Sequence, residues 1–532
     1  MILGLQNAVR ELLQMIRRFS CAKLLAAALL LVLMAGCMVG PDYKTPKARV
    51  AGQYMTNPMV TGNPLGTAEV YWWRNFNDPT LERLIQLACS NNLSLQVAGV
   101  RVLQSRAQLS KSIGDLFPQQ QAISGEIQYA RLRSPSTELI KGFTPDYATD
   151  QFLFAASWEI DVWGKIRRMI QANRAAYLGS IASYDDALVT LIADVAKNYV
   201  SLRTTEERIR VAITNAAAQK ESFRVAAAQF KYGETSELDM RQAATALAQT
   251  EAEIPKLQHA YNQIRNALAV LLGITPDEVA QHLTGPNRIP EAPSQVSVGI
   301  PRDLLRRRPD VRAAALAAAA QCSLVGVAKA SMFPSFSLAG AIGYSANNEG
   351  KNSLSDIFMW ENRAAQAGAS FTFPVFNYGR LLNQVRVQDA SFQEAILNYE
   401  NTVLAAQKEV EDGLSAFNNQ QQVLARLTEA ATNAQRSTQL SMVQYKAGEA
   451  NYTTVLSTEQ SQLSVEDSLA QAKGSVLLGL ISIYRALGGG WEIREGHDIV
   501  PPEVKAEMAR RTDWGRMLEP QHHLPKQPIE TQ

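Results

Sequence analysis

The sequence predicts an α+β membrane protein that arose by tandem duplication. Two observations carry this prediction. Short motifs of the first half return in the second half at a nearly constant distance, and each half combines an alternating β-hairpin with a very long helical hairpin. The repeat is much longer than the roughly 20 to 50 residues of a solenoid or propeller repeat. We therefore expect two large equivalent halves rather than an array of small ones.

The repeated motifs occur in the same order in both halves. Four pairs of segments are related by an offset of 215 residues, or 216 for the last pair: Gln229–Glu234 and Gln444–Glu449, Val162–Lys165 and Asn377–Arg380, Leu272-Gly273 and Leu487-Gly488, and Phe117-Pro118 and Phe333-Pro334. Any one of these matches is weak, but four in order at one spacing indicate a duplication. They divide the chain into a first repeat at 78–296 and a second repeat at 297–490.

The chain begins with the layout of a secretory signal. A basic stretch precedes an apolar run, Leu24–Gly36, whose 13 residues are too few to span a bilayer as a helix. Met34–Cys37 resembles a bacterial lipobox, so we expect cleavage of residues 1–36 and a covalent lipid, palmitate included, on Cys37. Residues 37–77 then form a lipidated N-terminal segment. An ordinary signal peptide with an incidental cysteine is the alternative, and Met15 is an alternative start to Met1.

Composition excludes several classes of protein. The 52 basic and 50 acidic residues are interspersed, so no basic face indicates nucleic-acid binding. No phosphate-binding loop, His-Glu-x-x-His or Gly-x-Ser-x-Gly motif occurs, which argues against an enzyme, a metal site or any cofactor other than the lipid on Cys37. Cys89 and Cys322 lie in alanine-rich stretches and are expected to be small core residues, with a disulfide between them as the alternative.

Each repeat opens with a helix. In the first, Asp78-Pro79 supplies a cap and a proline for the first helical position, and the helical region extends to Gly114 with a break at Asn91-Asn92. In the second, the helical region extends from Pro301 to Met332. It is expected to break before Pro309 and to start again with Asp310 as cap.

A β-hairpin follows, at 119–163 in the first repeat and at 335–378 in the second. Apolar residues alternate with small or polar ones, which fits strands of a transmembrane barrel, although alternation alone equally fits a soluble sandwich. In a barrel, the segments Leu132–Thr149 and Ala346–Asn362 are the external loops. The aromatic residues near the strand ends would then form an interface belt: Trp158, Trp163, Phe373 and Tyr378.

Two very long helices complete each repeat. Lys165–Lys231 contains no proline, and apolar residues recur in it every seven positions from Ile181 to Phe230, which predicts supercoiling against neighbouring helices. The chain reverses near Gly233 and returns to Leu272, with an expected kink at Pro255. The second repeat does the same over Arg380–Tyr445, with its reversal near Gly448 and its return to Leu487. The polar tail at 491–532 is expected to be disordered.

Four strands cannot close a barrel, and an open sheet edge cannot lie in lipid, but three chains would supply twelve strands. With that requirement in view, the chain resembles the outer-membrane factors of tripartite efflux systems, the TolC-like channel-tunnels, and among them the NodT-type lipoproteins. Five segments carry the resemblance and cover nearly the whole mature chain: Gly36–Tyr43, Tyr71–Pro79, Trp158–Arg168, Leu305–Arg312 and Ala486–Trp491.

The resemblance implies a homotrimer with a 12-stranded barrel, four strands per chain, in outer-membrane lipid above a periplasmic α-helical tunnel. It further implies a passive exit duct for small toxic compounds or drugs, with a role in antibiotic resistance. A periplasmic adaptor protein and an inner-membrane pump of the RND type would be the partners. One alternative is an exit duct for secreted polypeptides, which the lipobox disfavours. Another is a periplasmic scaffold lipoprotein without a pore, which would need no alternating hairpins.

The resemblance also assigns roles at the two helix reversals. Gly233 and Gly448, with Glu234 and Glu449, would be the periplasmic tips that contact the adaptor. Asp239 matches an aspartate of the gate region, although a solvated residue at a helix start is an alternative reading. Where relatives carry a constricting leucine and aspartate, this chain has Thr453 and Ser457, and Glu459 is the nearest alternative acid.

Overall fold

The structure is a computed structural model that describes residues 38–52, 55, 70–131, 146–285, 287–291, 307–347 and 357–519. Cys37, the signal peptide and much of both predicted external loops lie outside these residues. The chain divides into two compact units. The strand unit comprises Met1–Thr45, Ser105–Tyr177 and Leu316–Ile396, and the helical unit comprises Pro46–Gln104, Leu178–Ala315 and Leu397–Gln532.

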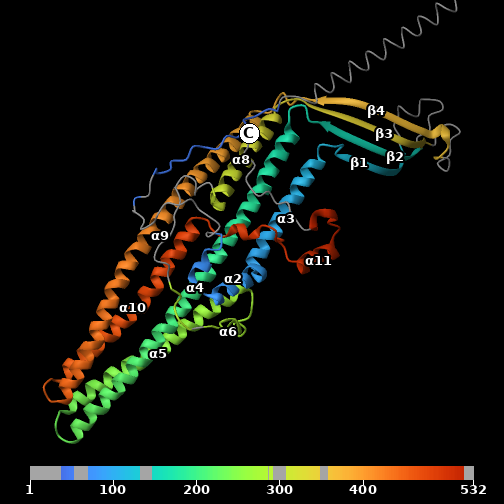
Figure 1. Cartoon of the computed structure of the whole chain (residues 1–532). Coiled ribbons are helices and arrows are strands. Elements are labelled where there is room, and N and C mark those ends of the chain that lie inside the picture. Colours follow the sequence, from blue (N-terminus) through green and yellow to red (C-terminus); the bar gives the residue numbers. More distant parts are fainter. Residues whose placement is uncertain are drawn as a thin grey trace, which may run out of the picture. The chain divides into compact units, whose positions relative to one another are not determined.

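The strand unit contains one antiparallel sheet of four strands in sequence order, β1 (Gln120–Arg131), β2 (Asp146–Ile160), β3 (Ser335–Asn347) and β4 (Arg363–Thr372) (Figure 1). Both predicted hairpins are present, and β2 pairs with β3 to join them. β2 begins inside the predicted external loop Leu132–Thr149, so that loop is shorter than expected at its second end.

The register of the sheet separates two kinds of side chain. Directly opposite residues of an antiparallel pair share a face. One row across the sheet is Ile123, Phe154, Ile342 and Ala365, and the adjacent row is Ala122, Ala155, Ala341 and Gln366. The first row and its equivalents form an apolar face, and the second row and its equivalents form a face of small and polar residues. The alternation predicted from the sequence is therefore confirmed.

Shorter helices open each repeat. α2 (Pro79–Asn91) begins at the predicted cap, because the Asp78 carboxylate accepts hydrogen bonds from the backbone N–H groups of Thr80 and Leu81 at 2.8 and 3.3 Å. α3 (Leu93–Gly114) follows the predicted break. α8 (Pro309–Ala330) begins two residues earlier than a cap at Asp310 predicts, so Asp310 lies in its first turn rather than before it. α8 is long and apolar enough to cross a membrane by composition, a test that packed core helices also pass.

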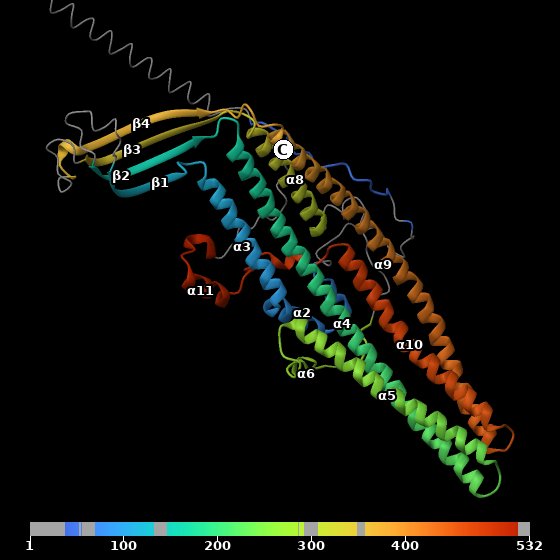
Figure 2. The same ribbon diagram turned by 180° about the vertical axis from the view of Figure 1, so that it is seen from behind.

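The long helices match the prediction closely. α4 (Lys165–Lys231) and α9 (Arg380–Lys446) each have 67 residues, and each is followed by an antiparallel partner, α5 (Glu237–Leu272) or α10 (Tyr452–Ala486). Figures 1 and 2, seen from opposite sides, both show each hairpin as two adjacent helices. Pro255 lies inside α5, which continues through it. The short α6 (Val279–His282) follows.

Within the helical unit, the seven-residue pattern of α4 marks the buried stripe. Ile181, Leu188, Val195 and Leu202 are at most 3% exposed, whereas Phe230, near the reversal, is 39% exposed. Glycines let the neighbouring helices approach closely, since a Cβ atom at Gly474 would collide with the Thr204 side chain. This close packing fixes which face of α4 meets α10.

The prediction of a disordered C-terminal tail is wrong for residues 491–519. This segment forms η5 (Trp491–Arg494), α11 (Pro502–Arg511) and η6 (Gly515–Leu518). Its polar composition conceals a few buried anchors. Val500 is fully buried, and the Arg494 guanidinium donates to the buried Asp185 carboxylate with an Nε–Oδ1 distance of 2.5 Å. The segment is thus part of the core of the helical unit.

Candidate gate at the helix reversals

The two reversals have the same backbone geometry. At the first, the N–H of Gly233 donates to the carbonyl of Phe230 at 3.0 Å and the N–H of Glu234 to that of Gln229 at 2.9 Å. At the second, Gly448 and Glu449 donate to Tyr445 and Gln444 at 3.1 and 2.9 Å. The glycine φ angles are 79° and 74°. This is the Schellman ending, in which a glycine in the left-handed region satisfies the last carbonyls of a helix.

Both tip glycines are explained by their positive φ angles and not by close packing. A Cβ atom built on either would meet nothing within 4 Å. Glu234 and Glu449 beside them are exposed. The two tips therefore have open space beside their glycines and present exposed carboxylates to solvent in the single chain, although this does not test their predicted contact with an adaptor.

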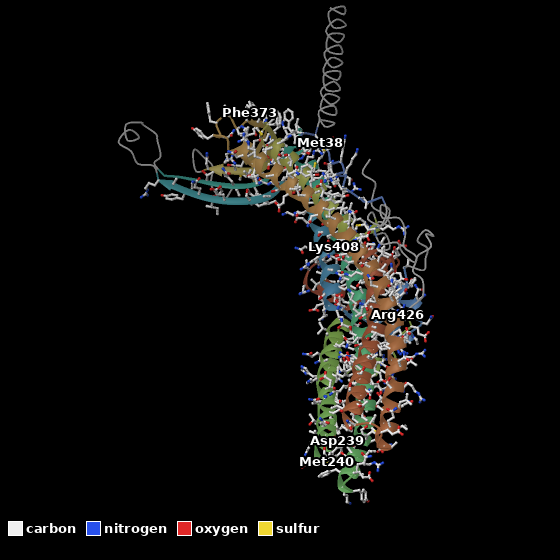
Figure 3. All side chains as sticks on the ribbon, turned by 90° about the vertical axis from the view of Figure 1, so that its left-hand side faces the viewer. Met38, Asp239, Met240, Phe373, Lys408 and Arg426 are labelled. Carbon is white, nitrogen blue, oxygen red and sulfur yellow. The ribbon has the colours of Figure 1, made fainter. Side chains whose placement is uncertain are left out.

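Asp239 lies in the first turn of α5, close to the first reversal (Figure 3). The Thr235 hydroxyl donates to its Oδ2 atom at 2.7 Å, and the residue is half-buried. The predicted gate acid is thus oriented by a local hydrogen bond rather than free in solvent.

Tyr445, at the end of α9, lies beside this carboxylate. Burial, together with the nearby charge of Asp239, raises the pKa of the Tyr445 hydroxyl, which has no hydrogen bond of ordinary geometry. The ring is 4% exposed and packs edge-on against Tyr452, with centroids 5.3 Å apart. These two tyrosines form a small core with Ala226, Ala243 and Val455, so α4, α5, α9 and α10 all meet here.

Glu459, the nearest alternative acid, is buried within the single chain. It is 4% exposed on α10, and the Ser222 hydroxyl of α4 donates to its Oε1 atom, while its Oε2 atom has no partner. Burial raises the pKa of this carboxyl group, and the hydrogen bond from Ser222 opposes the rise only in part. The Glu459 side chain therefore points into the packing between α10 and α4.

Thr453 and Ser457, the other predicted gate positions, are both exposed on α10. The structure thus gathers Asp239 with Thr235 and Tyr445 and leaves Thr453 and Ser457 at the surface. Sequence reasoning missed Tyr445, yet a signal was present. Tyr445 belongs to a repeated tip motif and occupies the position of Phe230 in the first repeat, so the second repeat has a ring with a hydroxyl where the first has a phenylalanine.

The N-terminal segment is held close to the start of α4, within the strand unit. The backbone N–H of Val39 donates to the carbonyl of Trp163 at 3.1 Å. The buried Arg168 side chain binds the Asp42 carboxylate at 2.9 Å. Met38 contacts Gly164, so the residue after the predicted lipidation site lies where β2 passes into α4.

Within the described residues, no group of three or more His, Cys, Asp or Glu side chains could hold a metal ion. Cys89 and Cys322 are free, so they do not form the disulfide considered as an alternative. Burial raises the pKa of the Cys89 thiol to about 12, which keeps it protonated and unreactive at neutral pH.

The chain is similar to known efflux proteins over most of its length. It is 29% identical over 484 residues to the probable efflux pump outer membrane protein TtgC of Pseudomonas putida, covering 89% of this chain and 96% of that protein. It is 28% identical to the probable outer membrane lipoprotein SilC of Salmonella typhimurium, covering 88% and 99%. The solved outer-membrane channel OprN matches with a TM-score of 0.76 and 31% identity, covering 86% of this chain and 100% of that one.

The family described as "Outer membrane efflux protein" matches residues 84–274 and, a second time, residues 300–489. The two matches follow the two halves that the repeated motifs define. The chain therefore belongs to the outer membrane efflux protein family, and it is an efflux exit channel of the outer membrane.

Proposed function

We propose that three copies of the chain assemble into one channel, with a 12-stranded barrel in the outer membrane and a helical tunnel in the periplasm. The observation that carries this proposal is the four-stranded sheet, whose first and last strands, β1 and β4, have no second neighbour among the residues that the structure describes. Its apolar face suits lipid, with Ile123 68% and Phe371 72% exposed. Because unpaired strand edges are not tolerated in lipid, other copies must complete the sheet.

The long helices support the same assembly. α9 exposes large apolar side chains along its length, among them Val387, Leu397 and Leu404, each 55% exposed. A stripe of this kind on a soluble surface indicates a protein interface. In a ring of three chains these residues would pack against the helices of the next copy.

Through this duct, we expect small toxic compounds to leave the cell without energy input from the channel itself. An inner-membrane pump would supply the energy, and a periplasmic adaptor would bind the tips at Gly233-Glu234 and Gly448-Glu449. TtgC is named as part of an efflux pump, which supports partners of this kind. The lipoprotein name of SilC supports lipidation of Cys37.

The gate of the proposed channel would be the tip cluster formed by Thr235, Asp239 and Tyr445. Contact with the adaptor would separate α4–α5 from α9–α10 at this end and release the contact between Asp239 and Tyr445. An exit duct for polypeptides would use the same architecture with a different inner-membrane partner. A scaffold without a pore is disfavoured, because it would not need the apolar sheet face.

Conductance of the purified protein in planar lipid bilayers, measured beside its mass in detergent, tests the proposal. We expect a trimer that forms discrete channels. A trimer without conductance would support the scaffold, whereas a monomer without conductance would contradict the closed barrel.

A further inference from the structure

The segment that follows β4 exposes apolar side chains that no other described residue covers. Phe373, Val375, Phe376 and Tyr378 are 52%, 64%, 88% and 99% exposed. Figure 3 labels Phe373, which lies at the end of the sheet that leads into α9. We call residues 373–378 the exit surface of the second repeat. Four neighbouring apolar residues at such exposure indicate a missing partner.

The first repeat shows how the equivalent surface is covered. With the offset of 215, the counterparts of Phe373, Val375 and Tyr378 are Trp158, Ile160 and Trp163, which are all half-buried. β3 covers them, since Ile160 lies opposite Phe336 in the β2–β3 ladder. The exit surface of the first repeat is thus covered by the beginning of the second repeat.

Trp163 makes the most specific of these contacts. Its ring stacks on Phe333 with centroids 4.8 Å apart and an interplanar angle of 30°. Its indole N–H donates to the carbonyl of Pro334 at 2.7 Å. The Phe-Pro pair that precedes β3 therefore receives the aromatic residue that follows β2.

The first repeat has the same Phe-Pro pair before β1, but no aromatic ring stacks on it among the described residues. Phe117-Pro118 corresponds to Phe333-Pro334, and the Phe117 ring is 63% exposed. β1 is also an edge strand, with β2 as its one neighbour in the sheet. We call the packing of an aromatic residue after one hairpin on the Phe-Pro pair before the next strand a joint. The chain contains one complete joint, between Trp163 and Phe333-Pro334. It also carries the two separate parts of a second joint, Phe117-Pro118 and Tyr378, next to the two edge strands.

Backbone strain provides an independent observation at Tyr378. Its φ of 49° lies in the left-handed region, and among the described residues only Asn77 shares this feature without being glycine. Such a conformation costs free energy for a residue with a side chain and persists where surrounding contacts determine it. In the single chain the Tyr378 side chain has no such contacts, so the conformation is explained by a partner.

We infer that Tyr378 of one copy stacks on Phe117-Pro118 of the next copy, as Trp163 stacks on Phe333-Pro334 within the chain. The occupant of the exit surface is therefore a second copy of this chain, and the contact is repeated three times around the ring. The inference rests on the proposed trimer, and it adds the residues of the joint and the strand register.

The template also gives the register of β4 against β1 of the next copy. Within the chain, Ala155 of β2 lies opposite Ala341 of β3. At the offset of 215, which keeps the apolar faces of β1 and β3 in step, their counterparts are Ser370 of β4 and Glu126 of β1. These two residues should therefore lie directly opposite each other across the subunit boundary, on the small and polar face. The Phe-Pro pairs are offset by 216, so one residue more lies between Phe117 and Glu126 than between Phe333 and Ala341.

Site-specific photo-crosslinking tests the stacking. A benzophenone amino acid replaces Tyr378 in the full chain, and the crosslinked peptides are identified by mass spectrometry. We expect crosslinks between copies that map to residues around Phe117-Pro118. The matched control places the same group at Trp163, where crosslinks must stay within one chain and map to Phe333-Pro334.

The register is tested by cysteine pairs in a chain that lacks Cys89 and Cys322. Ser370→Cys with Glu126→Cys should form a disulfide between copies on mild oxidation. Ser370→Cys with Gln128→Cys, shifted by two residues on the same face, should not, because diagonal neighbours are too far apart for a bond between the sulfur atoms.

The oligomeric state, measured on the same samples, separates the two proposals. Trimers whose Tyr378 crosslinks map elsewhere, or whose shifted pair forms the disulfide instead, would overturn the joint and leave the trimer standing. Protein that is monomeric in detergent and gives no crosslink between copies would overturn both.

Discussion

Asp239 lies where the first turn of α5 meets the end of α9, with its carboxylate bonded to Thr235 and close to Tyr445. Removing the carboxylate should loosen the closed tips, because the hydrogen bond with Thr235 and the charge beside Tyr445 of α9 are lost. We predict that Asp239→Ala increases the leak of the closed channel. Single-channel conductance and the sensitivity of cells to large antibiotics measure this leak.

Ser457→Ala is the matched comparison, since Ser457 is exposed and makes no contribution to the tip cluster in the chain. We expect it to behave like the parent. If Asp239→Ala also equals the parent in both measurements, the constriction lies in another turn of the helices.

Glu459 gives a prediction of pH dependence. Because burial raises its pKa in the folded state, the folded protein binds more protons than the unfolded chain between the ordinary and the raised pKa. Stability conferred by this residue is therefore lost as pH rises through that window. Glu459→Gln cannot ionise, so it should be more heat-stable than the parent near pH 8 and differ less near pH 4.

Thermal unfolding of both proteins at the two pH values provides the measurement. Glu449→Gln serves as the control, because that carboxylate is exposed at the second tip and should show no such difference. An equal gain in thermal stability for both variants would mean that the change in net charge, and not the burial of Glu459, causes the effect.

At the scale of single residues, the sequence predicted which residues lie near the tips better than it predicted which way their side chains point. Asp239 could be assigned from its place after a tip glycine. The burial of Glu459 against Ser222 could not be predicted, because it depends on how α10 is rotated against α4. That rotation is fixed by distant packing, such as the approach of Gly474 to Thr204.

The helix reversals are elements whose glycines are required by conformation alone. Gly233→Ala and Gly448→Ala place a side chain in the left-handed region without any clash, so each should destabilise the folded protein by about 1–2 kcal/mol. Gly114→Ala is the matched control, because a Cβ atom there also meets nothing but φ is not positive. It should be neutral or slightly stabilising. The midpoint of thermal unfolding reports both effects, and equal shifts for all three variants would contradict the conformational explanation.

The C-terminal segment is the element that depends most on one buried ion pair. Burial raises the pKa of Asp185 to about 6 even though Arg494 is bonded to it. Arg494→Met would leave this carboxyl group with Arg312, 3.8 Å away, as its remaining cation, and should cost about 3–5 kcal/mol. The loss should be larger above pH 6, where the carboxyl group must ionise.

The double variant Asp185→Leu with Arg494→Met tests the cause, since it removes both charges and should recover much of the stability. Chemical denaturation at pH 5 and pH 8 measures each variant. A double variant no better than Arg494→Met would mean that packing of the Arg494 side chain, and not the charge, holds the segment.

Elements whose signals are local could be predicted almost to the residue. α4 has no internal proline, carries a seven-residue apolar repeat and ends at a glycine, and it was predicted with its observed bounds. The tail from Trp491 could not be predicted in this way. Its order comes from a few side chains, such as Val500 and Arg494, that are buried by parts of the chain far away in sequence.

At the scale of the whole molecule, the duplication organises both the fold and the proposed assembly. Each repeat contributes two strands and one long helical hairpin, and β2 with β3 already forms one contact between repeats inside the chain. A ring of three chains would use this contact six times, three within chains and three between them. The assembly would then need only one kind of joint, which explains why the edges of the single chain carry complementary halves of it.

The last prediction concerns the lipid expected on Cys37, a residue outside those that the structure describes. Cys37→Ser should abolish lipid labelling, since the thiol is the group to which the lipid is expected to be attached. It should not abolish assembly, because the residues that follow are fixed by the protein itself, through the bond from Val39 to Trp163 and the ion pair of Asp42 with Arg168. Membrane fractionation and the mass of the extracted protein check both parts. Labelling that persists in the variant would mean that the lipobox has been misassigned, and a variant found as monomer would mean that the lipid, rather than the barrel, drives assembly in the membrane.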